Sequence, residues 1–121
     1  MRAHDDMAAA DALREPVSGD ETARAADVLR NLADPTRLHL LRLLATAPQD
    51  VSELTDQVDA SRSSVSQHLG RLRHSGLVAA DRVGRRMLYR LTSDHLAALV
   101  AEAYQFAAHD LHGIPHHRGG G

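Results

Sequence analysis

Residues 51–74 contain two helical segments that are separated by only a few residues, and this arrangement restricts how the chain can fold. In residues 62–74, Val65, Leu69 and Leu72 recur at i, i+4 and i+7, which places them in one apolar stripe along a helix. A shorter helix is expected over residues 51–58, with Ser52 as its cap, and residues 59–61 then form a tight turn. The pattern predicts a helix-turn-helix.

The segment that follows, residues 77–91, predicts a β-hairpin that turns at Val83-Gly84. Three further helices are expected, from Asp20 to Leu32, from Pro35 through a leucine-rich segment to residue 44, and from Ser93 to Leu111. The predicted fold is therefore mainly α with a small β-hairpin wing: a winged helix-turn-helix with about five helices and two strands. The domain should span residues 20–112, between a flexible N-terminal arm (1–19) and a flexible His-rich tail (113–121).

Charge is distributed unevenly along the chain. The 121 residues carry a net charge of −2, yet residues 61–90 carry seven Arg and one acid, which gives this segment a charge of +6. A concentrated positive segment is typical of a nucleic-acid-binding surface. A solvated arginine-rich face is the alternative interpretation of the charge alone.

The face of residues 62–74 opposite the apolar stripe carries small polar, amide and arginine side chains, which can reach base edges in a major groove. Gly70 on this face permits close approach of the backbone. Base-edge contacts are assigned to Ser63, Ser66 and Gln67, and phosphate contacts to Arg62, Ser64, Arg71, Arg85 and Arg86. By contrast, His68 is expected to pack at the flank of the helix, and Arg37 is expected to be structural.

Composition excludes several other classes of protein. The chain has no Cys, and all fourteen of its basic residues are Arg, so thiol, thiolate-metal and lysine Schiff-base chemistry are excluded. With one Phe, two Tyr and no Trp, it has few aromatic rings on which single-stranded bases can stack. There is no Ser/His/Asp set, phosphate loop or pair of acids to indicate an enzyme, and no segment is apolar enough for a membrane span. A cytoplasmic duplex-DNA-binding protein is expected.

Histidines accumulate near the C-terminal end of the chain. Five of the nine lie in the last 27 residues, and nitrogen and carboxylate donors without sulfur suit Ni(II), Co(II) and Zn(II). The candidate metal ligands are His95, His109, His112, His116, His117, Asp94 and Asp110. His95 and His109 would stand about 21 Å apart on one helix, so they can share an ion only if two such helices pair antiparallel across a dimer axis.

The segments LADPTRLHLLRLL (32–44), SRSSVSQHLGRLRHSGLV (61–78) and RVGRRMLYRL (82–91) together resemble the ArsR/SmtB family of metal-responsive bacterial repressors. The resemblance covers about residues 22–112. It implies a homodimer, joined through its first and last helices, that binds the two half-sites of an inverted-repeat DNA operator.

The family's metal site between the final helices pairs an acid-x-His motif with a His-x-x-His or His-x-x-acid motif of the partner. His95 and His109 match two of these positions, whereas Ser93 and Phe106 stand where an acid and a His are expected. The extension AAHDLHGIPHHR (107–118) resembles the nickel- and cobalt-sensing branch, in which tail residues add ligands. In that pattern His95, His109 and His117 are retained, and Ala108 replaces a carboxylate that Asp110 or Asp94 can supply.

These observations predict a dimeric repressor that responds to Ni(II), with Co(II) or Zn(II) as alternatives. Two other functions stay open. One is a DNA-binding regulator that a protein corepressor controls in place of metal, because the acid-x-His motif is broken. The other is a nickel storage or delivery protein that uses its His-rich tail.

Overall fold

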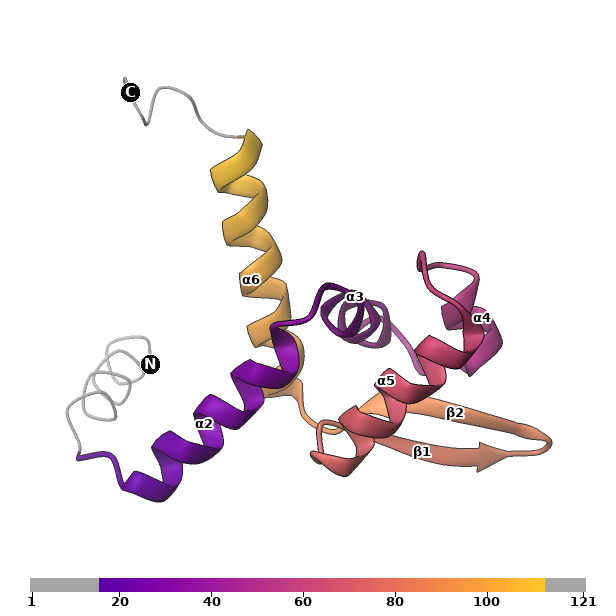
Figure 1. The fold of residues 1–121 in the computed structure, drawn as a ribbon, viewed down its shortest axis with the longest axis horizontal. Helices are drawn as coiled ribbons and strands as arrows, with labels where there is room; N and C mark the ends of the chain where they lie inside the picture. Colours follow the sequence, from indigo (N-terminus) through magenta and orange to yellow (C-terminus); the bar gives the residue numbers. More distant parts are fainter. Residues whose placement is uncertain (1–15, 113–121) are drawn as a thin grey trace, which may run out of the picture.

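The computed structural model describes residues 16–112. Within this range it contains five helices and one two-stranded sheet (Figure 1). The elements are α2 (Gly19–Leu32), α3 (Pro35–Leu44), α4 (Val51–Thr55), α5 (Arg62–His74), β1 (Val78–Val83), β2 (Arg86–Leu91) and α6 (Asp94–His112). The predicted fold class, mainly α with a β-hairpin wing, is confirmed. Residues 1–15 of the expected arm and the tail 113–121 lie outside the described residues.

Side-chain caps determine where the helices begin. Ser18 and Glu21 form a capping box, so α2 begins at Gly19, one residue before the expected Asp20. Asp34 caps α3, whose first residue is the proline of the DPTR segment, and Ser61 caps α5.

The cap of α4 differs from the expectation. It is Asp50, not Ser52, because the Asp50 carboxylate accepts the backbone N–H of Glu53 at 2.8 Å while the Glu53 carboxylate accepts that of Asp50 at 2.9 Å. The helix is also shorter than the predicted 51–58, because it ends at Thr55 and a turn follows.

The core lies where α3, α4, α5, β1 and the beginning of α6 meet. The predicted stripe of α5 is confirmed, since Val65, Leu69 and Leu72 are each 0% exposed. Leucines from α3 and α4 and one valine of α6 complete the fully buried set: Leu40, Leu41, Leu54 and Val100. The core therefore holds α5 by its apolar stripe and leaves the opposite face of that helix in solvent.

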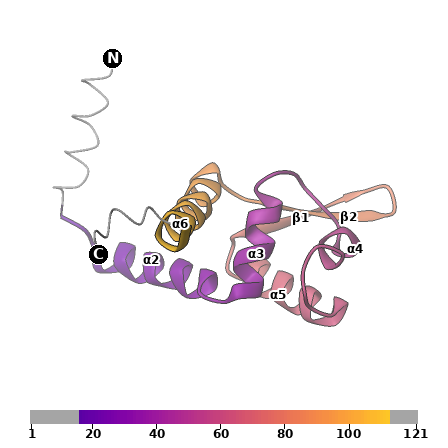
Figure 2. The same ribbon diagram turned by 90° about the horizontal axis from the view of Figure 1, so that it is seen from above.

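The wing is an antiparallel hairpin whose register runs from Val78 opposite Leu91 to Val83 opposite Arg86. Its turn falls at Gly84–Arg85, one residue later than expected, and Gly84 has a φ of 64°, which a residue without a Cβ adopts at little cost. Gln49 and Tyr89 exchange backbone hydrogen bonds of 3.1 and 2.8 Å, so the loop before α4 is joined to the wing. Figure 2 shows the hairpin extending from the body beside α4.

Helix α6 is only partly embedded in the molecule. It begins at Asp94, and its buried residues are Leu96 and Val100 in the first two turns, whereas residues 105–112 are all exposed. Figure 1 shows its second half projecting away from the body. Within residues 16–112, no helix combines the length and the apolar character that crossing a membrane requires.

Candidate nucleic-acid interface

The solvent face of α5 carries the side chains that were assigned to DNA. Ser63, Ser66, Gln67 and Arg71 are exposed, while Ser64 is half-buried beside the cap. At Gly70, a Cβ would find no atom within 4 Å, so this face is open at its centre. Hydroxyl, amide and guanidinium groups on an open helix face are suited to hydrogen bonds with base edges in a major groove.

One flank of α5, between its solvent face and its apolar stripe, is anchored to the corner between α2 and α3. His68 lies 3.4 Å through Nδ1 from a terminal nitrogen of Arg37, and 3.8 Å through Nε2 from the carboxylate of Asp34. The Arg37 guanidinium is buried and donates through Nε to the carbonyl of Asn31 at 2.8 Å. The structure therefore places His68 at the packed flank and Arg37 in a structural position, as expected from the sequence.

Asp34 sits at the centre of this anchor. The backbone N–H of Arg37 donates to its carboxylate, and this hydrogen bond is the main reason why the pKa of Asp34 is lowered. Desolvation raises that pKa, while the positive charge of Arg37, and that of His68 when it is protonated, lower it further. An ionised Asp34 thus both caps α3 and faces the flank of α5.

Three of the arginines near the wing take part in contacts within the protein. The Arg86 guanidinium lies 3.0 Å from an Asp50 oxygen and 2.6 Å from a Glu53 oxygen. Arg62 donates to the hydroxyl of Ser52 at 2.6 Å, and Arg90 pairs with Asp81 at 2.7 Å. The Arg86 contacts tie the wing to α4, the Arg62 contact ties the first turn of α5 to α4, and the Arg90 pair joins the two strands of the wing.

The ion pair at Arg86 was not predicted; this residue was expected to contact phosphate. The hydrogen bond that Arg86 donates to the Asp50 carboxylate and the charge of Glu53 raise the pKa of Arg86. Asp50 in turn has a lowered pKa, first through the Glu53 backbone N–H and then through Arg86. The spacing of Asp50 and Glu53 is that of a capping box, a signal available in the sequence. Their contact with Arg86, 36 and 33 residues further along, depends on the tertiary fold.

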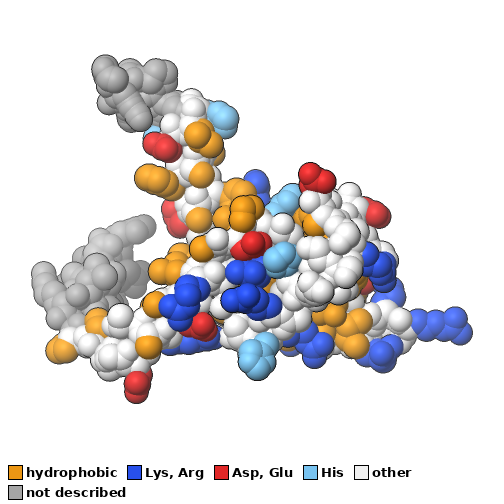
Figure 3. Space-filling view, in the orientation of Figure 1, with side chains coloured by type: hydrophobic (Ala, Val, Ile, Leu, Met, Phe, Trp, Pro, Cys, Tyr) orange, Lys and Arg blue, Asp and Glu red, His pale blue; other side chains and the backbone are white. Residues whose placement is uncertain are grey.

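Two other arginines near the end of the wing differ from Arg86. Arg82 and Arg85 are exposed, and within the described range neither has a carboxylate within salt-bridge distance. Figure 3 shows basic side chains at the far tip of the hairpin. The wing therefore presents arginine guanidinium groups to solvent.

The candidate metal ligands occupy both ends of α6. Asp94 and His95 lie in its first turn, and His109, Asp110 and His112 lie in its last turns, all of them exposed. Among residues 16–112 of one chain, no three His, Asp or Glu side chains come close enough to hold a metal ion. His116 and His117 lie outside the described residues.

Large apolar side chains are exposed on α2 and α6. Leu29 of α2 is 54% exposed, and on α6 Leu99 is 40%, Phe106 73% and Leu111 77% exposed. Figure 3 shows hydrophobic side chains along the projecting part of α6. Apolar patches of this kind mark surfaces that contact another molecule.

Taken together, a buried stripe on α5, an open polar face on the same helix and an arginine-bearing hairpin define a winged helix-turn-helix DNA-binding protein. Residues 34–80 match the family "Bacterial regulatory protein, arsR family". The chain belongs to this family of bacterial regulators.

Relatives with curated descriptions agree with this assignment. The chain is 42% identical over 113 residues to the HTH-type transcriptional regulator KmtR of Mycobacterium tuberculosis, covering 93% of this chain and 87% of that one. It is 37% identical over 94 residues to the HTH-type transcriptional regulator NmtR of the same organism, covering 78% of each. A DNA-binding transcriptional regulator, and not an enzyme, is the function that these relatives share.

Solved structures show the same fold. M. tuberculosis Rv0081 superposes with a TM-score of 0.67 at 36% identity, covering 78% of this chain and 95% of that one. The transcriptional repressor BigR from Xylella fastidiosa superposes with a TM-score of 0.67 at 34% identity, covering 72% of this chain and 89% of that one.

Proposed function

We propose that the protein is a dimeric, metal-responsive transcriptional repressor that binds an inverted-repeat operator, with Ni(II) as the favoured metal and Co(II) or Zn(II) as alternatives. The observation that carries the DNA-binding part is the open face of α5. It carries Ser, Gln and Arg side chains, whereas a helix face that is merely solvated more often carries Glu and Lys. In a winged helix-turn-helix this face enters the major groove. Because the operator is duplex DNA, we place the protein in the cytoplasm.

The proposed contacts divide by chemistry. Ser63, Ser66 and Gln67 read base edges, and the Gln67 amide can pair bidentately with adenine. Arg62, Ser64, Arg71, Arg85 and Arg86 contact phosphates and set the register. For Arg86, a phosphate contact requires the guanidinium to leave Asp50 and Glu53 or to be shared with them.

Dimerisation is supported by the exposed apolar residues of α2 and α6. At 100° per residue, His95, Leu99, Phe106 and His109 fall within about 80° of arc on α6. Burying this stripe against a second copy removes apolar surface from water. Two recognition helices related by a two-fold axis then match the two half-sites of an inverted repeat.

The same stripe holds the proposed metal donors. His95 and His109 are about 21 Å apart along α6, so each can meet its counterpart only if two α6 helices run antiparallel. His112, Asp94, Asp110 and the tail residues His116 and His117 are the further donors available near such a site. Imidazole and carboxylate donors suit Ni(II), Co(II) and Zn(II), and a bound ion would link the two α6 helices.

The test is operator binding followed by fluorescence anisotropy, on a duplex selected by the protein from random sequences. Adding Ni(II), Co(II) or Zn(II) should change the affinity by about 5- to 150-fold for the cognate metal. His95→Ala and His109→Ala should abolish this change and leave metal-free binding intact, whereas the control His39→Ala on α3 should respond like the wild type.

Two outcomes would overturn the metal-responsive part. If both α6 variants respond like the wild type, the metal is bound elsewhere. If calorimetry finds no stoichiometric metal on the purified dimer, control by a protein corepressor is favoured, a hypothesis that the broken acid-x-His motif motivates. A chain that binds Ni(II) but selects no duplex would instead be a storage or delivery protein.

A further inference from the structure

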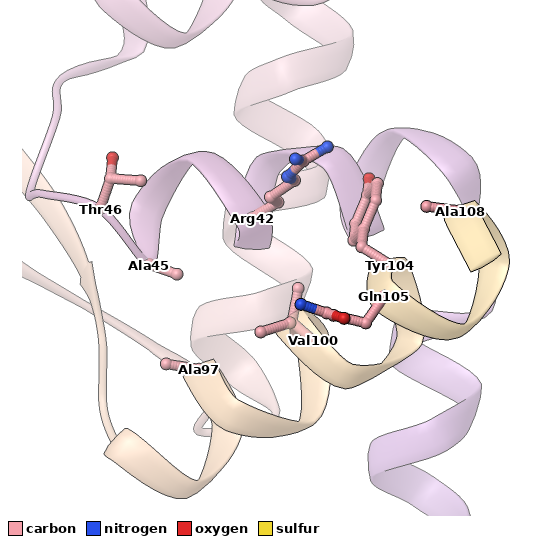
Figure 4. Close-up of a pocket in the computed structure, with 9 residues that line it drawn as sticks. Arg42, Ala45, Thr46, Ala97, Val100, Tyr104, Gln105 and Ala108 are labelled. Carbon is pink, nitrogen blue, oxygen red and sulfur yellow. The ribbon is translucent and has the colours of Figure 1, made fainter. Parts of the chain in front are cut away.

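A groove of about 460 Å³ lies between the C-terminal end of α3 and the side of α6 that faces it (Figure 4). Arg42 and Thr46 contribute from the α3 side, and Ala97, Val100, Tyr104 and Ala108 from α6. At 100° per residue, the groove-lining residues of α6 are centred about 160° to 180° from Phe106. The groove thus lies on the opposite side of α6 from the proposed dimer and metal surface.

The groove combines an apolar floor with one positive charge. Alanine methyl groups and the side chain of Val100 form the floor, and the guanidinium carbon of Arg42 lies 4.3 Å from the centroid of the Tyr104 ring. Arg42 is exposed, and within residues 16–112 no carboxylate lies within salt-bridge distance of it. The Tyr104 ring holds the Arg42 guanidinium in place. The N–H donors of the guanidinium lie in the plane of that group, so they can still reach an acceptor.

These features select one class of ligand. Among residues 16–112, those that line the groove include no His, Asp or Glu, so this lining does not suit a metal ion. An inorganic anion would leave the apolar floor in contact with water, and the single cation matches a single negative charge. A guanidinium pairs with a carboxylate through two parallel hydrogen bonds, and the volume is within the range of small-molecule sites.

We propose that the groove between α3 and α6 binds a small organic monocarboxylate, with its carboxylate on Arg42 and a compact apolar body on the alanine floor beside Tyr104. This site is separate from the proposed DNA and metal sites, and it needs neither of them to be correct.

The test compares benzoate with benzamide, its neutral analogue of nearly the same shape, on the full chain in the presence of a metal chelator. Titrations are followed by ligand-observed NMR or calorimetry. Benzoate should bind at least about tenfold more tightly than benzamide, the factor that corresponds to one charge-assisted pair of modest strength. Arg42→Gln should remove this preference, and Arg73→Gln, which changes an exposed arginine on α5, should retain it.

A second variant tests the apolar floor independently of charge. Ala101 also lines the groove, and Ala101→Leu should weaken benzoate and benzamide alike by filling the space. The proposal is overturned if the wild type binds the two probes equally, if Arg42→Gln still prefers benzoate, or if Ala101→Leu binds both probes like the wild type. Circular dichroism and the melting temperature establish that each variant is folded.

Discussion

Arg37 holds the corner between α2 and α3, and it is the one charged side chain among the described residues that is buried. Its Nε donates to the carbonyl of Asn31, and a terminal nitrogen reaches the carbonyl of Arg30 at 3.4 Å. Arg37→Ala should lower the free energy of unfolding by about 1 to 3 kcal/mol, because a buried carbonyl loses its donor. Urea unfolding measures this change.

The matched control for Arg37 is Arg30→Ala, which removes an exposed guanidinium from the last turn of the neighbouring helix. It should change the free energy of unfolding by no more than about 0.5 kcal/mol. Equal losses in the two variants would show that burial of Arg37 is not what stabilises the corner.

Arg85 and Arg86 are neighbours in sequence with different surroundings, and they should differ in the salt dependence of operator binding. Arg85→Ala should reduce the slope of log affinity against log salt concentration by about 0.9, as expected for one lost phosphate contact. Arg86→Ala should reduce the slope less, because Asp50 and Glu53 already neutralise its guanidinium. Equal reductions would mean that Arg86 leaves the carboxylates for a phosphate.

At the scale of elements, two glycines should respond to alanine with opposite signs. Gly84 in the turn of the wing has a φ of 64°, and Gly84→Ala should cost about 1 to 2 kcal/mol. Gly70 is inside α5 with open space at its Cβ position, and Gly70→Ala should stabilise the helix by about 0.5 to 1 kcal/mol. Melting temperatures of the two variants measure both effects, and a shared sign would contradict the assigned backbone conformations.

The cap of α3 should make stability depend on pH in the acid range. The folded-state pKa of Asp34 is lowered, so its carboxylate contributes stability above the unfolded-state pKa, and this contribution is lost as the pH falls through the folded-state value. Wild type should therefore exceed Asp34→Asn in urea midpoint at neutral pH, and the gap should close as the pH falls below about 4. A gap that stays constant down to pH 2.5 would contradict the role of the charge.

The elements show which parts of the fold follow from local pattern. The i, i+4, i+7 spacing of Val65, Leu69 and Leu72 is a property of one helix, and their burial was predicted. The wing was predicted with its turn one residue early, since Val83 still pairs with Arg86 in the ladder. Hairpin ends depend on which backbone groups meet, and composition alone does not determine this.

Contacts between distant segments were not predictable in the same way. The pairing of Arg86 with Asp50 and Glu53, and the placement of Arg42 over Tyr104, each join residues more than 30 positions apart. Such pairs arise only when the elements are packed, so a sequence pattern shows the charges without their partners. Of the seven arginines in residues 61–90, the structure pairs Arg86 and Arg90 with carboxylates. Asp81, the partner of Arg90, is already counted in the charge of +6, whereas Asp50 and Glu53 lie outside the segment. The pairing of Arg86 therefore makes the positive surface weaker than the charge of this segment implies.

At the scale of the whole molecule, the exposed stripe of α6 should control assembly. Phe106→Glu should convert a dimer, with twice the 13.1 kDa mass of the chain, into a monomer, because a charge at an apolar interface loses its hydration. Ala108→Glu, which adds the same charge about 200° away on α6, should stay dimeric. Size-exclusion chromatography with light scattering measures both masses.

The monomeric variant should also bind the operator more weakly, because a monomer carries one recognition helix and contacts only one half-site at a time. A dimeric Phe106→Glu protein would place the subunit interface on another surface.

The partial embedding of α6 has a mechanical consequence. Its 19 residues form a rod about 28 Å long that is buried in the core at Leu96 and Val100, is half-buried at Ala97 and Tyr104, and is exposed elsewhere in the single chain. A rod held near one end works as a lever. The held end of α6 contacts α3, and α3 in turn contacts α5. We therefore expect a force applied near His109 to act through the long arm of α6, so that a large displacement of its far end produces a small tilt where α6 contacts α3.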